Sequence, residues 1–245
     1  MPAFTGVWAS VLCFTPSWVT KLNFYEWKPL AEQGVAEAQY NLGLIYSRGQ
    51  EIPQDNSEAA HWYRLAAEQG FAEAQTNLGL MYGKGQGIEQ NYREAVKWYR
   101  LAAEQGLAQA QHNLGVMYGR GQGVVKNYQE AIWWFKLSAD QGYAQAQYNL
   151  GLMHNRGEGV PRDDKEAVKW YRLSAQQRIP GAQSNLGLMY EKGLGVKQDY
   201  IEAHKWFNLA GINGNEVGRK NADIVEKKMT PGQIVVAVGL AREWL

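Results

Sequence analysis

The spacing of apolar residues along this chain predicts a series of paired helices. Early in the sequence, apolar residues recur at intervals of four, three and one, which places them on one face of an amphipathic helix, here called helix A. They are Ala38, Leu42, Ile45 and Tyr46. We expect helix A to end at Gly49, because glycine readily adopts the left-handed conformation that closes a helix.

A second apolar stripe follows and predicts a partner helix, here called helix B. Its apolar positions are Ala59, Trp62, Tyr63, Ala66 and Ala67. Asp55 stands before the stripe, with Glu58 three residues later, and this order resembles a capping box, in which two side chains satisfy the free amides at a helix start. Gly70 marks the end of helix B.

This pair of helices recurs at a fixed interval of 36 residues. Asn-Leu-Gly stands at 41–43, 77–79, 113–115, 149–151 and 185–187, and the aromatic marker of helix B at Trp62, Trp98, Trp134, Trp170 and Trp206. A period of this length is typical of solenoids, in which each unit packs only on its neighbours. The sequence therefore predicts an all-α solenoid of about five helix-turn-helix repeats.

Several positions depart from the repeat and predict local differences. Glu51 occupies a loop position that is glycine in the later repeats, so we expect the first loop to differ. Arg178 replaces the glycine that ends helix B and Pro180 follows, which predicts a distorted turn. Pro29 lies in a partial repeat before the first full one, where we expect a helix to start or kink.

Every helix A contains an internal glycine, although glycine in a helix costs about 1 kcal/mol relative to alanine. We interpret the repetition as a sign that helix A passes very close to a neighbour, with Trp or Tyr beside the missing side chain. These glycines are Gly43, Gly79, Gly115, Gly151 and Gly187.

The two ends of the chain differ from the repeats, which gives three predicted regions: 1–22, 23–226 and 227–245. Region 1–22 is apolar and aromatic, and three interpretations stay open: a cap on the first repeat, an irregular or misassigned start, or a degraded export signal. Region 227–245 should form a capping helix, because Thr230, Pro231 and Gln233 make a favourable helix start.

Composition narrows the possible functions. The net charge of +1 gives no general attraction to nucleic acid. A single cysteine, Cys13, excludes an intrachain disulfide. No apolar run is long enough to span a membrane. The histidines lack ligand spacing, so we expect no metal or other cofactor; they are His61, His112, His154 and His204.

We expect a cytoplasmic location for the sequence as given, or a periplasmic or secreted one if a signal peptide precedes it.

The repeated motifs resemble a known family. Ala-x-Ala-Gln-x-Asn-Leu-Gly-x-Met-Tyr, then Gly-x-Gly-Val, Glu-Ala-x-x-Trp-Tyr and Ala-Ala-Glu-Gln-Gly are similar to the Sel-one-like repeat, a bacterial relative of the tetratricopeptide repeat, and the match covers residues 23–245. The resemblance implies a right-handed α/α superhelix. It also implies a non-catalytic scaffold or adaptor that binds a protein or peptide.

By analogy with tetratricopeptide repeats, helix A should line the concave surface and carry the binding residues. Amide and cationic side chains could together hold an acidic or carboxylate-ended peptide. The same cations could instead complement the helix dipole, and the asparagines could bond a neighbouring loop. The amide series is Asn41, Asn77, Asn113, Asn149 and Asn185, and the cationic series Arg48, Lys84, Arg120, Arg156 and Lys192.

Two further positions on this face vary between repeats, as partner-specific residues or neutral surface positions would. The first reads Tyr40, Thr76, His112, Tyr148 and Ser184, and the second Ser47, Gly83, Gly119, Asn155 and Glu191.

There are two alternatives to a scaffold. A β-lactamase-like or other envelope hydrolase is disfavoured, because none of the seven serines has the lysine three residues later that this chemistry normally shows. A self-assembling element could use the apolar region 1–22 as an interchain contact. The oligomeric state does not follow from the sequence.

Overall fold

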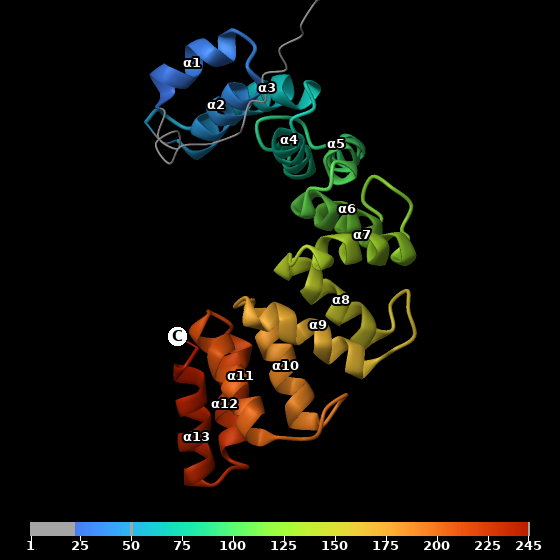
Figure 1. Cartoon of the computed structure of the whole chain (residues 1–245), viewed down its shortest axis with the longest axis vertical. Coiled ribbons are helices and arrows are strands. Elements are labelled where there is room, and N and C mark those ends of the chain that lie inside the picture. The colour runs from blue at the N-terminus through green and yellow to red at the C-terminus, as the bar shows by residue number, and fades with distance from the viewer. Residues whose placement is uncertain (1–22, 50, 245) are drawn as a thin grey trace, which may run out of the picture.

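The chain folds into helices that stack in sequence order along an arc (Figure 1). The structure, a computed structural model, describes residues 23–49 and 51–244, so the interpretations of region 1–22 lie outside it. Within the described residues there are thirteen α-helices and no strand. They are α1 (Phe24–Glu32), α2 (Ala36–Arg48), α3 (Asn56–Glu68), α4 (Ala72–Lys84), α5 (Tyr92–Glu104), α6 (Ala108–Arg120), α7 (Tyr128–Asp140), α8 (Ala144–Arg156), α9 (Asp164–Gln176), α10 (Pro180–Lys192), α11 (Tyr200–Ile212), α12 (Glu216–Glu226) and α13 (Pro231–Arg242).

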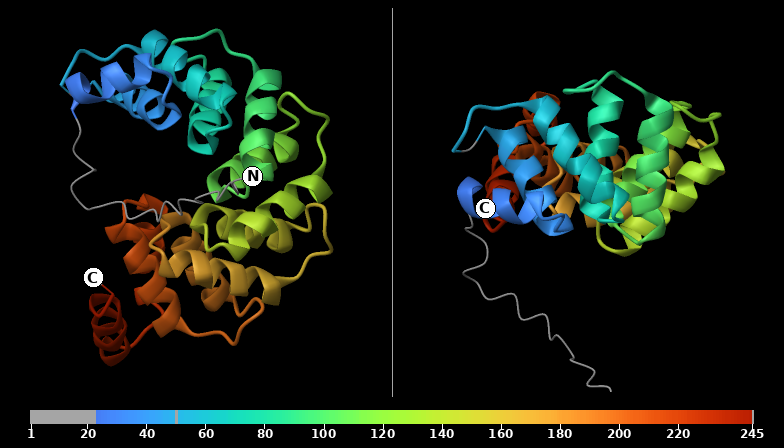
Figure 2. Two further views of the ribbon diagram at one scale, coloured as in Figure 1. Left: turned by 45° about the horizontal axis from the view of Figure 1, so that its top comes forward. Right: turned by 90° about the horizontal axis from the view of Figure 1, so that it is seen from above.

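The predicted helix pairs are confirmed. Helix A of the five repeats corresponds to α2, α4, α6, α8 and α10, and helix B to α3, α5, α7, α9 and α11. Each helix A packs most extensively on helix B of its own repeat, and each helix B packs on the next helix A. Two further views show the same stacking around an arch, with α1 and α13 at its two ends (Figure 2). The core is therefore continuous along the arc rather than central, as in other solenoids.

Helix A ends and helix B begins as the sequence predicts, with one correction. Gly49 and its equivalents close helix A at φ between 64° and 70°. Asp55 caps helix B by accepting hydrogen bonds from two backbone amides. The reciprocal bond from Glu58 that a capping box requires is not formed at this helix, so that part of the prediction is wrong. The reason is that the Asp55 amide already donates to the Tyr46 carbonyl at 3.0 Å.

The internal glycine of helix A meets an aromatic ring of helix B, which is a tyrosine in three repeats, as predicted, and a phenylalanine in the other two. A Cβ added at Gly115 would lie 2.8 Å from two ring carbons of Phe135 and 3.1 Å from the carbonyl oxygen of Ala131. Equivalent contacts recur between Gly43 and Tyr63 and in the other repeats. The absence of a side chain thus lets helices A and B approach closely.

Buried glutamine side chains connect each repeat to the next, a feature that the sequence analysis did not anticipate. Gln75, 4% exposed, donates through Nε2 to the Ala67 carbonyl at 3.1 Å and accepts at Oε1 from Gln105 at 2.8 Å. The sequence signal for this contact is the Gln of the repeated Ala-x-Ala-Gln motif. Its side-chain amide bonds a carbonyl at the end of the preceding helix, which packing removes from water. Equivalent glutamines are Gln39, Gln111, Gln147 and Gln183.

Three irregular positions have outcomes that differ in kind. The first helix does not start at Pro29: α1 begins at Phe24 behind an Asn23 capping box and includes the proline. Glu51 adopts φ 69°, close to the 67° of Gly87, but its carboxylate accepts a hydrogen bond from the Phe24 amide at 2.8 Å, so the first loop differs in its contacts. Arg178 has φ 64°, against 85° to 91° at the glycines that end the earlier helices B, and its amide bonds the Ala175 carbonyl at 3.0 Å, so the turn is shifted but keeps the hydrogen bond that the glycine turns make.

The C-terminal helix α13 packs on α11. Its start is the predicted one, since Thr230 and Gln233 form both bonds of a capping box. The ring of Trp244 lies 5.3 Å from that of Trp206, and Arg178 donates to the Trp244 carbonyl at 3.0 Å. These contacts fix α13 against the last helix B.

Candidate functional site

The asparagines of helix A are half-buried, and some already have partners within the solenoid. Asn41 donates to the Glu37 carbonyl of its own helix at 2.9 Å. Asn149 Nδ2 lies 3.0 Å from Nε2 of His112, which belongs to the preceding repeat. The amide series therefore takes part in contacts between repeats, and the amide oxygen of Asn149 is the group that is directed away from His112.

His112 is held in its neutral form by its surroundings. Burial lowers the pKa of His112, and the nearby Arg120 charge adds to this effect. Its Nδ1 lies 3.2 Å from Asn113 Oδ1, so a neutral ring that donates from Nδ1 and accepts at Nε2 satisfies both asparagines. The ring also packs against Phe135, with centroids 5.7 Å apart.

The tyrosines at the position equivalent to His112 pack on helix B of their own repeat. Tyr40 lies with its ring centroid 5.9 Å from that of Tyr63 and 5.1 Å from that of Phe71, which precedes α4. Burial raises the pKa of Tyr40. The ring centroid of Tyr148 is 6.1 Å from that of Tyr171. These tyrosines therefore stabilise the pairing of helices A and B in addition to forming part of the surface.

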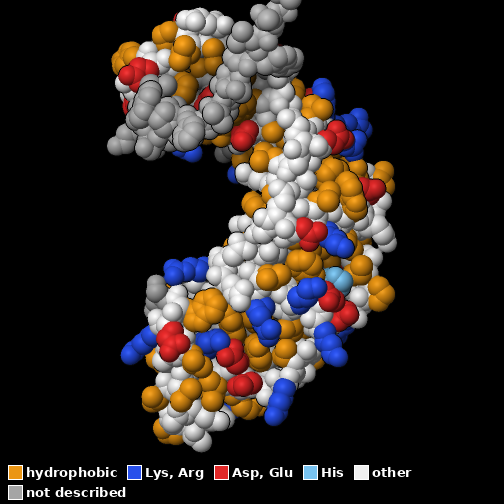
Figure 3. Space-filling model, viewed as in Figure 1, with side chains coloured by type: hydrophobic (Ala, Val, Ile, Leu, Met, Phe, Trp, Pro, Cys, Tyr) orange, Lys and Arg blue, Asp and Glu red, His pale blue; other side chains and the backbone are white. Residues whose placement is uncertain are grey.

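The cationic series lies at the surface, in the last turn of each helix A, where a positive charge complements the helix dipole. Arg156 lies 3.8 Å from Glu158, and exposed pairs of this kind contribute about 0–1 kcal/mol. On the face shown in Figure 3, Lys and Arg side chains are interspersed with Asp and Glu rather than gathered into one patch.

Equivalent cavities open at three successive junctions between repeats. We name them by the small residue in the last turn of helix A: the Ser47, Gly83 and Gly119 cavities, of about 240, 230 and 340 Å3. Each is lined by an aliphatic residue of helix A, an aromatic residue of helix B, and Asn and Met of the next helix A. In the Gly119 cavity these residues are Val116, Phe135, Asn149 and Met153.

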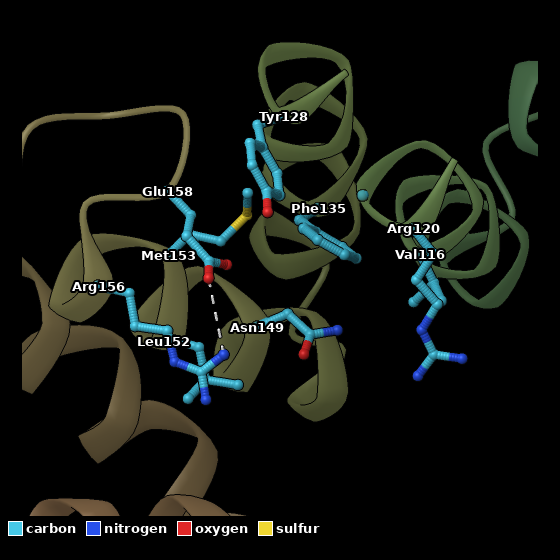
Figure 4. A pocket seen from close by; sticks show the side chains of 10 residues that line it. Val116, Arg120, Tyr128, Phe135, Asn149, Leu152, Met153, Arg156 and Glu158 are labelled. Carbon is cyan, nitrogen blue, oxygen red and sulfur yellow. Dashed lines mark ion pairs between the residues drawn. The ribbon is translucent and has the colours of Figure 1, made fainter. Parts of the chain in front are cut away.

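Figure 4 shows the Gly119 cavity between α6, α7 and α8. Phe135 and Asn149 lie in the middle of the view, and the side chains of Arg120 and Arg156 lie on opposite sides of them. The lining thus combines apolar side chains with the Asn149 amide, two arginines and Glu158, which lies 3.8 Å from Arg156. The sequence identified the variable series that includes Gly119. It did not predict the cavities, because these form only where two repeats meet.

Other kinds of site find no support in the described part of the chain. No three His, Cys, Asp or Glu side chains are grouped there so as to hold a metal ion. None of its helices has the length and apolar character needed to cross a bilayer.

Stacked 36-residue helical pairs with a recurrent cavity at their junctions define an α/α repeat protein. The Sel1 repeat, the Sel-one-like repeat of the sequence analysis, matches residues 36–71, 72–107, 108–143, 144–178 and 180–215, and the chain belongs to this family. Members typically serve as non-catalytic scaffolds for protein interactions.

Solved structures of similar proteins share the fold. A protective antigen of uropathogenic Escherichia coli with an SLR fold is 38% identical with a TM-score of 0.86, over 90% of this chain and 48% of its own length. This chain thus spans about half of that antigen. A Sel1 repeat protein from Oxalobacter formigenes is 37% identical with a TM-score of 0.75, over 85% of this chain and 86% of its own.

A more distant structure shares the fold alone. An immunity protein from Pseudomonas aeruginosa is 19% identical with a TM-score of 0.51, over 85% of this chain and 81% of its own. Comparison with curated proteins gives no match.

Proposed function

We propose that this protein is a non-catalytic scaffold that binds an acidic or carboxylate-bearing segment of a protein partner along helix A, on the concave side of the solenoid. The recurrence of the cavity at three junctions is the observation that carries this proposal. A partner that crosses several repeats would meet the same set of aliphatic, aromatic, Asn and Met side chains at each, with cations at two of the three cavities, which suits an extended chain better than a compact small molecule.

The composition of the Gly119 cavity favours binding over hydrolysis by a Ser or Cys nucleophile. Its lining residues include no serine, cysteine or histidine to supply the nucleophile and its activating base. Its ionisable groups are Arg120, Arg156, Tyr128 and Glu158. Arginines at such a rim bind carboxylates through charge-assisted hydrogen bonds, which are about twice as strong as neutral ones.

Affinity capture with the full chain tests this proposal. Arg120→Glu should reduce recovery of the partner strongly, because the cation lines two adjacent cavities. Arg93→Glu is the matched control: it reverses the same charge at an exposed position in the first turn of α5, away from the cavity lining. Equal recovery by wild type, Arg120→Glu and Arg93→Glu would exclude the helix A surface as the binding site.

A further inference from the structure

Two glycines of helix A have no packing role that requires glycine. A Cβ at Gly119 would meet only the Ala131 Cβ at 3.7 Å, and one at Gly83 would lie 3.9 Å from the Ala95 Cβ, both ordinary contacts. Gly115, on the same helix as Gly119, has no such room. A helical glycine that packing does not demand still lowers helix stability. What these glycines provide is open space, since each lines one of the cavities.

At the fourth junction the same position is filled. Asn155 replaces the small residue, donates through Nδ2 to Asp164 Oδ1 at 3.2 Å and lies 3.8 Å from Met189 Sδ. Asp164 and Met189 are the equivalents of two residues that line the Gly119 cavity, so Asn155 bridges the walls of the would-be cavity. The hydrogen bond from Arg162 lowers the pKa of Asp164, which keeps this carboxylate charged and the bridge in place.

Cations alternate with the open cavities along the arc. Lys84 and Arg120 both line the Gly83 cavity, and Arg120 and Arg156 both line the Gly119 cavity. Successive cavities are one repeat apart, because each helix A packs on its helix B and that helix B packs on the next helix A. Packed helices lie about 8–10 Å apart and an extended chain rises about 3.3 Å per residue, so about three to six peptide residues span the distance from one cavity to the next.

We propose that the three cavities bind an extended acidic peptide in which apolar side chains recur at a regular interval of about three to six residues, with acidic residues between them facing Lys84, Arg120 and Arg156. The length of peptide that binds depends on the residue in the series Ser47, Gly83, Gly119 and Asn155. A small residue leaves the cavity open to a peptide side chain, whereas Asn155 fills the space and ends the binding site. This inference rests on the proposed function and specifies its ligand.

Fluorescence anisotropy with the full chain and labelled synthetic peptides tests the inference. The probe peptides contain three Leu-Asp-Glu units, joined directly or with one to three additional acidic residues between units, and the one that binds most tightly is called the spaced acidic peptide. The controls are a peptide of equal composition with the leucines adjacent and a Leu-Lys-Lys peptide. The spaced acidic peptide should bind at least about tenfold more tightly than either control, as expected when a buried leucine loses its site.

Variants of Gly119 and its equivalents provide the second test of the inference. Gly119→Asn should weaken binding of the spaced peptide by about tenfold or more, while Gly119→Ala, which adds only a Cβ, serves as the matched control. Gly83→Asn tests the same effect independently at the Gly83 cavity. Asn155→Gly should let a peptide with a fourth Leu-Asp-Glu unit bind more tightly than the three-unit peptide, a gain that wild type does not show. Circular dichroism verifies that each variant is folded.

Three results would overturn the inference. They are equal affinity for the spaced and adjacent-leucine peptides, unchanged affinity of folded Gly119→Asn and Gly83→Asn, or no binding of any of the peptides. Each leaves the scaffold proposal standing as long as partner capture still depends on Arg120, so the two failures are distinguishable.

Discussion

The close contact at Gly115 makes a quantitative prediction about how helices A and B are held together. A Cβ at this position would lie 2.8 Å from ring carbons of Phe135, whereas carbon atoms normally approach to about 3.5–4.0 Å. Phe135 is 5% exposed and cannot rotate away, so α6 and α7 must separate. Overpacking of this kind costs about 1–3 kcal/mol.

Gly119 provides the matched control on the same helix. Gly119→Ala makes only an ordinary contact and should gain up to about 1 kcal/mol from helix propensity, a gain that Gly115→Ala shares. The two variants should therefore differ by about 1–3 kcal/mol in the free energy of unfolding, with Gly115→Ala the less stable. Gly115→Leu should be less stable still.

Thermal unfolding followed by circular dichroism measures this difference. For a chain of this length, 1 kcal/mol corresponds to a shift of about 2–4 °C in Tm. Hydrogen exchange should also show faster opening of α6 and α7 in Gly115→Ala, because repeats in a solenoid can open separately. If Gly115→Ala melts at or above the Tm of Gly119→Ala, the close approach does not determine the packing and our reasoning is wrong.

Two further predictions concern histidines that replace tyrosines. Because burial lowers the pKa of folded His112 below its usual 6.5, the unfolded chain takes up the proton first as the pH falls, and stability should be lost below about pH 6.5. Denaturant titrations at pH 7 and pH 5 should show a smaller loss of stability for His112→Tyr than for the wild type. Equal losses for the two proteins would contradict this prediction. Lys136 and His154 occupy the positions where other repeats pair an arginine with a tyrosine hydroxyl at 2.6 to 2.9 Å. The double variant Lys136→Arg/His154→Tyr should be stabilised by about 0.5–1.5 kcal/mol, with a favourable coupling energy in a double-mutant cycle, whereas purely additive single effects would refute the pairing.

Local features of the fold were predictable because each depends on a few neighbouring residues. Helix ends at Gly49 and caps at Asp55 follow from backbone geometry that a short stretch of sequence fixes. The Glu58 bond was mispredicted because the Asp55 amide is taken by the Tyr46 carbonyl, a contact between two helices. Arg178 kept its turn because the hydrogen bonds around it outweigh the cost of a left-handed arginine.

The candidate site was harder to predict, since it forms only where two repeats meet. The sequence identified Asn149 and Arg120 as candidates, and both line the largest cavity. It could not show that Asn149 also contacts His112 of the preceding repeat. The role of Gly119 as open space depends on the position of Ala131 on another helix, which no periodicity reveals.

The glutamine bridges between repeats have a consequence for how such a chain can change in length. Because Gln75, Gln111 and their equivalents make the same bonds at successive joints, a whole unit copied or deleted in register leaves the glutamine bonds of the remaining joints in place. The reach of the molecule toward a longer or shorter target can therefore be altered by duplication of one genetic module, without redesign of these bonds.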